Sequence, residues 1–141
     1  LIGKVKNNPR MKIPIIGNGD IVSPLSALQA FNNYGVDAIM IGRATVGHPW
    51  IFKEINHFLH TGEELPPMRL PEKVDLARMQ FRKSLEVKGI PRGIYEMRRH
   101  FVNYFKGLPD FRDIRMQLVT TLDIENIEKL LDDIRASYQQ Y

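Results

Sequence analysis

The stretch KIPIIGNGD, residues 12–20, joins a short apolar run to a glycine-containing turn, and DAIMIGRA, residues 37–44, repeats that plan. Both runs are brief, rich in β-branched residues and bounded by turn residues, which predicts two strands that are buried on both faces. Ile15 in the first run and Ile39 in the second lie 24 residues apart. This distance leaves room for one helix, so we expect a right-handed crossover between two parallel strands.

Helix signals occupy the segments between and after these runs. Ser23 and Pro24 are residue types that favour a helix N-cap and the first helical position, and Gly35 is a natural helix end. Pro49 begins a second helical pattern. The expected order is therefore strand, helix, strand, helix. Two strands alone make only a marginal sheet, so we expect either more chain before the first residue or a second molecule that completes the sheet.

Residues 61–71 contain three prolines and one glycine, which predicts a linker. After the linker, an apolar period of about 3.6 residues predicts helices near residues 72–88, 92–106, 111–120 and 124–139. Asp123 is a good N-cap for the last of these helices. The predicted organisation is an α/β segment over residues 1–60, a linker over 61–71, and an all-α domain of about four helices over 72–141.

The composition excludes several kinds of chemistry. The 141 residues include no cysteine, so the chain has no disulfide, no thiolate metal site and no cysteine nucleophile. Its apolar runs are only a few residues long, which argues against a transmembrane helix and against a membrane partner. The first residues lack the plan of a signal peptide, and we expect a cytoplasmic protein. Because the chain starts at Leu1, we expect it to be a piece of a longer one.

Positive charge is concentrated in the middle of the chain. The net charge is +4, but residues 69–115 hold twelve Lys and Arg against six Asp and Glu. One stripe of the predicted helix contains Arg92, Tyr95, Arg99, Asn103 and Lys106. Two interpretations stay open: a surface for a polyanion such as RNA, or an ordinary solvated helix face. Tyr95 and Tyr104 likewise suit either base stacking or core packing.

The two turns are the most informative feature for function. Gly17-Asn18-Gly19-Asp20 and Gly42-Arg43-Ala44 each follow a predicted parallel strand, at the edge where α/β folds bind ligands. Glycines allow backbone N–H groups to approach a phosphate closely, and Arg43 adds a charged donor. Asp20 better suits an Asx turn or a contact to a ribityl hydroxyl. Either turn alone is as well explained as an ordinary turn, but two turns in register favour a phosphate site.

The sequence resembles the tRNA-dihydrouridine synthases, with a closer match to their bacterial B-type branch, also called nitrogen-regulation-like proteins. The resemblance is carried by residues 13–21, 37–44 and 47–52, and it continues through 61–63, 97–100 and 104–109. It covers essentially the whole chain and keeps the order and spacing of the Asn-Gly-Asp and Gly-Arg-Ala elements. The resemblance implies a flavin-binding TIM barrel followed by a helical domain. This chain is expected to supply the last two βα units of the barrel and the helical domain.

The resemblance also implies an activity and assigns residues to it. The family reduces a uridine of tRNA to 5,6-dihydrouridine with FMN, which is itself reduced by NADPH. Asn18, Gly19 and Asp20 correspond to a segment that contacts FMN, and Gly42 and Arg43 correspond to the phosphate-binding pair. The arginine-rich helical segment resembles the part of the family that helps to hold tRNA. The candidates there, chosen by charge and helical spacing, are Arg92, Arg98, Arg99 and Lys106.

The chain lacks the residues that the family uses for proton chemistry and for contacts near the flavin and the substrate. The family uses a cysteine as proton donor, and a lysine and a histidine from middle barrel strands, and no segment here corresponds to those parts. We therefore expect no catalytic residue in this chain and no activity from it alone. His57 and His60 lie three residues apart with no third ligand nearby, so we expect no metal site. The open barrel edge is expected to allow two copies to pair as a homodimer. Two alternatives are a non-catalytic tRNA-binding helical module and another FMN- or phosphate-binding TIM-barrel oxidoreductase.

Overall fold

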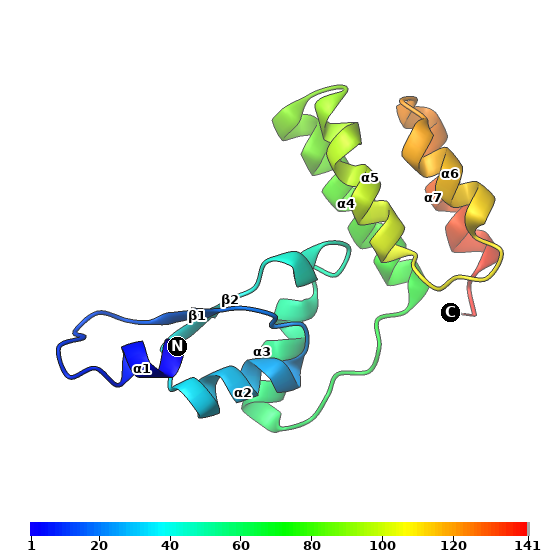
Figure 1. Cartoon of the computed structure of the whole chain (residues 1–141). Helices are drawn as coiled ribbons and strands as arrows, with labels where there is room; N and C mark the ends of the chain where they lie inside the picture. The colour runs from blue at the N-terminus through cyan, green and yellow to red at the C-terminus, as the bar shows by residue number, and fades with distance from the viewer. Residues whose placement is uncertain (141) are drawn as a thin grey trace. The chain divides into compact units, whose positions relative to one another are not determined.

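A computed structural model describes residues 1–140 and divides the chain into two compact units (Figure 1). The first unit runs from Leu1 to Pro66, and the second begins at Pro67. The division therefore falls within residues 61–71, the segment in which prolines predict a linker.

The first unit contains two parallel strands, each followed by a helix. Its elements in order are α1 (Ile2–Lys6), β1 (Ile16–Asn18), α2 (Pro24–Tyr34), β2 (Ala38–Met40), the 3₁₀ helix η1 (Arg43–Thr45) and α3 (Ile51–Thr61). β1 and β2 pair in parallel, with Ile16 opposite Ala38 and Asn18 opposite Met40. The parallel pair and its crossover helix are as the sequence predicts, although each strand is only three residues long.

The signals at the ends of α2 act as the sequence predicts. The Ser23 Oγ accepts a hydrogen bond from the backbone N–H of Ser26 at 3.2 Å, and the Ser26 Oγ accepts one from the Ser23 N–H at 3.0 Å. Together these bonds form a capping box. Gly35 ends the helix in the left-handed region at φ 61°, where its N–H donates to the Phe31 carbonyl. The chain therefore leaves α2 in the direction that lets β2 pair with β1.

Asp37 ties three elements of the first unit together. Its carboxylate accepts a hydrogen bond from the Ile15 N–H at 2.7 Å and from the Lys6 ammonium at 2.6 Å. The Ile15 N–H and the Lys6 charge lower the pKa of the Asp37 carboxyl, because both favour its ionised form. The start of β2 is thereby fixed to the residue before β1 and to α1.

The core of the first unit lies on one face of the two-stranded sheet. Ala27 and Ala30 of α2 and Ile51 and Ile55 of α3 are buried there, and Ile39 of β2 packs against them. The prediction that both strand faces are buried is wrong for this structure: Ile16 is 62% exposed and Met40 is 56% exposed. Both helices pack on the Ile39 side, and strand residues alternate between faces, so these two side chains lie on the other side.

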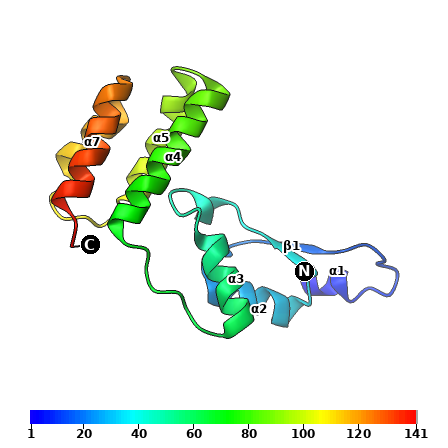
Figure 2. The ribbon, with the colours of Figure 1, turned by 180° about the vertical axis from the view of Figure 1, so that it is seen from behind.

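Up to residue 140, the second unit consists of four helices, in agreement with the predicted number. They are α4 (Leu70–Lys88), α5 (Arg92–Tyr104), α6 (Arg112–Thr120) and α7 (Ile124–Ser137). The predicted start at residue 72 and ends at residues 106 and 139 are each off by two residues. Asp123 caps α7 by accepting the Glu125 N–H at 3.0 Å. Figures 1 and 2 both show α4 and α5 side by side. Their contact is aromatic, with the Phe81 and Phe101 ring centroids 5.6 Å apart in an edge-to-face arrangement.

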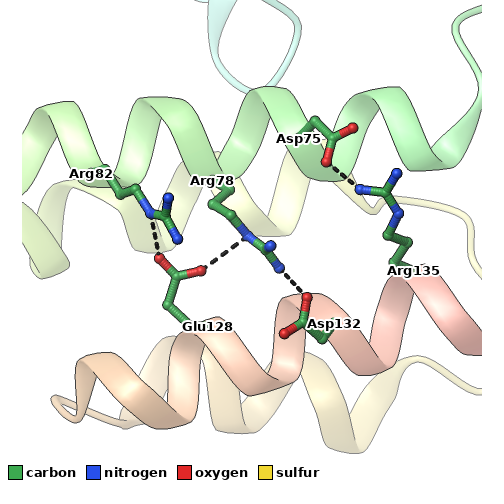
Figure 3. Close-up of polar contacts among 6 residues, drawn as sticks. All are labelled: Asp75, Arg78, Arg82, Glu128, Asp132 and Arg135. Carbon is green, nitrogen blue, oxygen red and sulfur yellow. Dashed lines mark hydrogen bonds and ion pairs between the residues drawn. The ribbon is translucent and has the colours of Figure 1, made fainter.

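Ion pairs join α4 to α7 (Figure 3). The Glu128 carboxylate lies 3.0 Å from Arg78 Nε and 2.8 Å from Arg82 Nε. Further pairs join Arg78 to Asp132 and Arg135 to Asp75. We call these six residues the α4–α7 ion-pair network. Arg78 and Glu128 are only 21% and 24% exposed, so this part of the network is screened less by salt than a fully exposed pair.

Candidate functional site

The five residues predicted to contact a cofactor lie together in one cleft of the first unit. The cleft has a volume of about 640 Å³. Its lining residues are Asn18, Gly19, Asp20, Ile21, Val22, Met40, Gly42, Arg43 and Ala44. The two turns meet because β1 and β2 run in parallel, which places the residues after both strands at the same sheet edge.

The backbone of the first turn is unusual. Gly19 has φ 141°, and Asp20 has φ 45° although it carries a side chain. Gly19 therefore occupies a conformation that side-chain-bearing residues rarely adopt. Asp20 in the left-handed region costs of order 1 kcal/mol or more, and such residues gather at functional sites. The strain turns the chain so that the Asp20 side chain faces the second turn.

The second turn offers unused backbone donors. Within residues 1–140, the N–H groups of Gly42, Arg43 and Ala44 donate no hydrogen bond, while the Gly42 carbonyl accepts the Thr45 N–H at 3.0 Å. A Cβ built on Gly42 or on Gly19 would meet no atom within 4 Å, so both glycines border open space. Adjacent free N–H groups beside open space suit an anionic group such as a phosphate. The residues present thus fit the FMN phosphate that the resemblance implies.

Arg43 supplies the positive charge of this cleft. Its guanidinium Nη2 donates to the Asp20 carboxylate at 2.9 Å. The two side chains are 94% and 87% exposed, and such exposed pairs contribute about 0–1 kcal/mol. Arg43 can therefore exchange the Asp20 carboxylate for a phosphate oxygen at little cost. Asp20 would then be free to accept a hydrogen bond from a hydroxyl group.

The residues predicted to bind RNA lie on α5 and just after it, but they differ in exposure. Arg92, Arg99 and Lys106 are exposed. None of the carboxylates within the described residues lies within 4.0 Å of their charged groups. Arg98 is half-buried, donates to the Thr120 carbonyl at 3.2 Å, and stacks over the Tyr95 ring with its Cζ 4.7 Å from the centroid. Arg98 therefore orients Tyr95, which is 50% exposed and able to contact a base.

Two other aromatic residues of α5 are buried in a polar network. Tyr104 is only 3% exposed, and its hydroxyl donates to the Gln80 Oε1 at 2.9 Å. The Gln80 Nε2 lies 3.2 Å from His100 Nδ1. Burial lowers the pKa of His100, and burial raises the pKa of Tyr104 well above its usual range. Both side chains belong to the core, which settles the choice between base stacking and core packing for Tyr104.

Two cations that sequence analysis did not single out stand beside Lys106. Arg112 and Arg115 are exposed on α6, and they line a second cleft together with Lys106. Their spacing of three residues on one helix was the available signal. The candidates were chosen by charge and helical spacing from residues 92–106, a choice that leaves out Arg112 and Arg115.

The remaining polar groups near the first cleft have structural contacts. The His48 Nε2 lies 2.8 Å from the Glu54 carboxylate, and its ring packs against Trp50 in a tilted arrangement, with the ring centroids 4.5 Å apart. Within residues 1–140 no group of three or more His, Asp or Glu side chains is placed to hold a metal ion. Over the same residues, no helix is both long enough and apolar enough to span a membrane.

Comparison with known proteins agrees with the resemblance seen in the sequence. A family model described as "Dihydrouridine synthase (Dus)" matches residues 1–139. The "tRNA-dihydrouridine synthase B" of Proteus vulgaris is 44% identical over 140 residues, which are 99% of this chain and 42% of the relative. That of Escherichia coli (strain K12) is 43% identical over 132 residues, 94% of this chain and 40% of the relative. That of Pseudomonas aeruginosa is 41% identical over 107 residues, 76% of this chain and 32% of the relative.

The chain therefore spans about two-fifths or less of the length of these relatives. The family match, in contrast, extends over nearly all of its residues, including both turns of the first cleft and all four helices of the second unit. The chain belongs to the dihydrouridine synthase family.

Proposed function

We propose that this chain is part of an FMN-dependent enzyme that reduces uridine in tRNA to 5,6-dihydrouridine with NADPH. The observation that carries the proposal is the cleft in which Asn18, Gly19, Asp20, Gly42 and Arg43 meet. The cleft lies after two parallel strands, at the sheet edge where the last βα units of a TIM barrel hold phosphates. The names of the relatives, "tRNA-dihydrouridine synthase B", support tRNA as the proposed substrate. We propose a cytoplasmic location because tRNA is found in the cytoplasm.

The first unit would hold the flavin. The free N–H groups of Gly42, Arg43 and Ala44, together with the Arg43 guanidinium, would bind the phosphate. Asn18 and Asp20 would orient the ribityl chain by hydrogen bonds to its hydroxyls. When bound, FMN supplies the hydride that reduces the uracil ring. The exposed apolar side chains of Ile16 and Met40 would face the rest of the barrel.

The second unit would hold tRNA. Arg92, Arg99 and Lys106 have no carboxylate partner among the described residues, so their charge is available to phosphates. Tyr95, held by Arg98, adds an aromatic face. The chain has no cysteine, so the proton donor that the resemblance implies would come from another part of the enzyme. We therefore propose that this chain binds the reactants and does not turn them over alone.

A chimera provides the test. The chain replaces the matching residues of the Proteus vulgaris relative, and the purified protein is examined for flavin absorption and for dihydrouridine formed in a tRNA transcript. We expect a yellow, active chimera. In it, Arg43→Met should weaken FMN binding about tenfold or more, because a charge-assisted hydrogen bond contributes roughly 1.5–3 kcal/mol. Lys53→Met, which removes an exposed cation of α3, should leave FMN affinity unchanged and serves as the control.

Other outcomes would favour the alternative functions. A soluble, colourless chimera that cannot be reconstituted with FMN, while the isolated chain still binds tRNA, would favour a non-catalytic tRNA-binding module. A yellow chimera that forms no dihydrouridine, while the unaltered relative does so under the same conditions, would favour another flavin-binding oxidoreductase. Equal FMN affinity in the Arg43→Met and Lys53→Met variants would refute the assigned phosphate site.

A further inference from the structure

We propose that a second cleft, between the end of α5 and the start of α6, binds phosphate groups of the RNA backbone. This inference rests on the proposed function, which makes tRNA the partner. The cleft has a volume of about 470 Å³. Its lining residues are Val102, Asn103, Phe105, Lys106, Gly107, Leu108, Phe111, Arg112 and Arg115. Three of these residues carry a positive charge, and none carries a negative charge.

The three cations are free to bind an anion. Among the described residues, no carboxylate lies within 4.0 Å of the charged groups of Lys106, Arg112 or Arg115. Asp110 and Asp113 are near in sequence but neither lines the cleft. In the α4–α7 ion-pair network of the same unit, by contrast, Arg78, Arg82 and Arg135 are all paired with carboxylates. The arginines between α4 and α7 are thus neutralised by carboxylates, whereas the three cations of the cleft between α5 and α6 are not.

The cleft is rigid because its wall is packed from behind. Gly107 turns the chain at φ 91°, a conformation that favours glycine. Behind the turn, the Phe111 ring packs against Phe105 at 5.8 Å and against Tyr138 at 6.3 Å between centroids. The Tyr138 hydroxyl also donates to the Pro109 carbonyl at 2.9 Å. A wall that is already formed loses less conformational entropy on binding than a flexible one.

An extended polyanion suits this cleft better than a single free phosphate. Lys106 belongs both to the cleft and to the exposed stripe that includes Arg92 and Arg99 on α5. From Arg92 to Asn103 that stripe extends about 16 Å at the helical rise of about 1.5 Å per residue. The cleft continues the stripe beyond the end of the helix. Cations spread over a surface of this length can contact several phosphates of one RNA strand, which a single free phosphate cannot do.

The experiment measures binding of a fluorescently labelled tRNA transcript to the 141-residue chain by anisotropy, over a range of salt concentrations. One variant combines Arg112→Ala with Arg115→Ala. The control combines Lys83→Ala with Lys129→Ala, which removes the same charge from exposed positions of α4 and α7. A third variant combines Arg112→Lys with Arg115→Lys and keeps the charge. Circular dichroism confirms that each variant is folded.

We expect the arginine-to-alanine pair to weaken binding at least tenfold at low salt. It should also reduce the slope of log affinity against log salt by about 1.4–1.8, because each lost phosphate contact contributes roughly 0.7–0.9. The control pair should change affinity less than twofold, and the lysine pair should keep most of the slope. Unchanged affinity and slope in the alanine pair would overturn the site, whether or not the chimera described above is active.

Two further results would overturn the inference. If the chain binds no tRNA, both this site and the proposed RNA partner fail, whereas flavin binding by the chimera is unaffected. If inorganic polyphosphate or phosphatidylserine vesicles bind as tightly as tRNA and lose affinity equally in the alanine pair, the cleft is a general anion site. The assignment to RNA is then refuted.

Discussion

Replacing Gly93 with alanine tests how α5 lies against α4. A Cβ at this position would stand 2.8 Å from the Ser84 carbonyl oxygen and 3.1 Å from the Leu85 Cα, both backbone atoms. Reaching 3.4 Å, where ordinary contacts begin, requires the helices to separate by about 0.6 Å. Such overpacking costs about 1–3 kcal/mol. It also stretches the hydrogen bond that Ser84 Oγ donates to the Gly93 carbonyl at 3.1 Å, worth about 1 kcal/mol.

Alanine also favours a helix over glycine by about 1 kcal/mol, which offsets part of this cost. The expected net loss is therefore about 1–2 kcal/mol in the free energy of unfolding of the second unit. Urea denaturation followed by far-ultraviolet circular dichroism measures it. The single tryptophan, Trp50, lies in the first unit, so its fluorescence should show an unchanged midpoint. Gly3→Ala is the control, because its Cβ would meet Tyr34 at an ordinary 3.7 Å. A Gly93→Ala variant as stable as the wild type would refute the close approach of the two backbones.

Three further substitutions test other contacts. Glu128→Gln should destabilise the second unit by about 1–3 kcal/mol, because Arg78 and Arg82 both lose a carboxylate and the half-buried Arg78 keeps only Asp132; an unchanged urea midpoint would count against this. Burial lowers the pKa of His100, so the unfolded chain takes up a proton near pH 6.5 while the folded one does not. Stability should therefore fall as the pH drops below about 6.5, and His100→Gln should flatten that slope in urea midpoints measured between about pH 5 and 8. Ser23→Ala removes the acceptor of the Ser26 N–H and should cost about 1 kcal/mol in the unfolding of the first unit, whereas Ser23→Asp should retain most of it.

The helices could be predicted from sequence because their ends carry local signals. Ser23, Gly35 and Asp123 act at the positions expected of them, through hydrogen bonds to residues within a few positions in the chain. Strands lack such local signals, since a strand exists only where a partner is paired. β1 therefore begins at Ile16, where Ala38 lies opposite, and not at the start of the apolar run. Whether both strand faces are buried depends on what packs there, which periodicity in one chain does not specify.

The candidate sites could be predicted in part. The spacing of the two turns predicts parallel strands, and parallel strands that are neighbours end at the same sheet edge. Gly19 and Gly42 accordingly line one cleft. The ion pair between Asp20 and Arg43 was not foreseeable, since it depends on the positive φ of Asp20. Arg112 and Arg115 were missed for a different reason: the RNA-binding candidates were chosen by charge and helical spacing from residues 92–106, whereas the fold brings the start of α6 beside Lys106.

Part of the positive charge of residues 69–115 is neutralised by ion pairs within the second unit. Residues 69–115 carry twelve Lys and Arg, but those of α4 include Arg78 and Arg82, which are paired with Glu128 of α7. Among the described residues, Arg92, Arg99, Lys106, Arg112 and Arg115 of α5, α6 and the turn between them lie within 4.0 Å of no carboxylate. Salt should therefore act on these two groups of charges unequally, because exposed contacts to phosphates are fully screened and the half-buried Arg78–Glu128 pair is not. RNA affinity should fall steeply over a salt range in which the helical content stays constant. If helicity is lost in step with affinity, the salt slope reports unfolding of the second unit and not release of RNA.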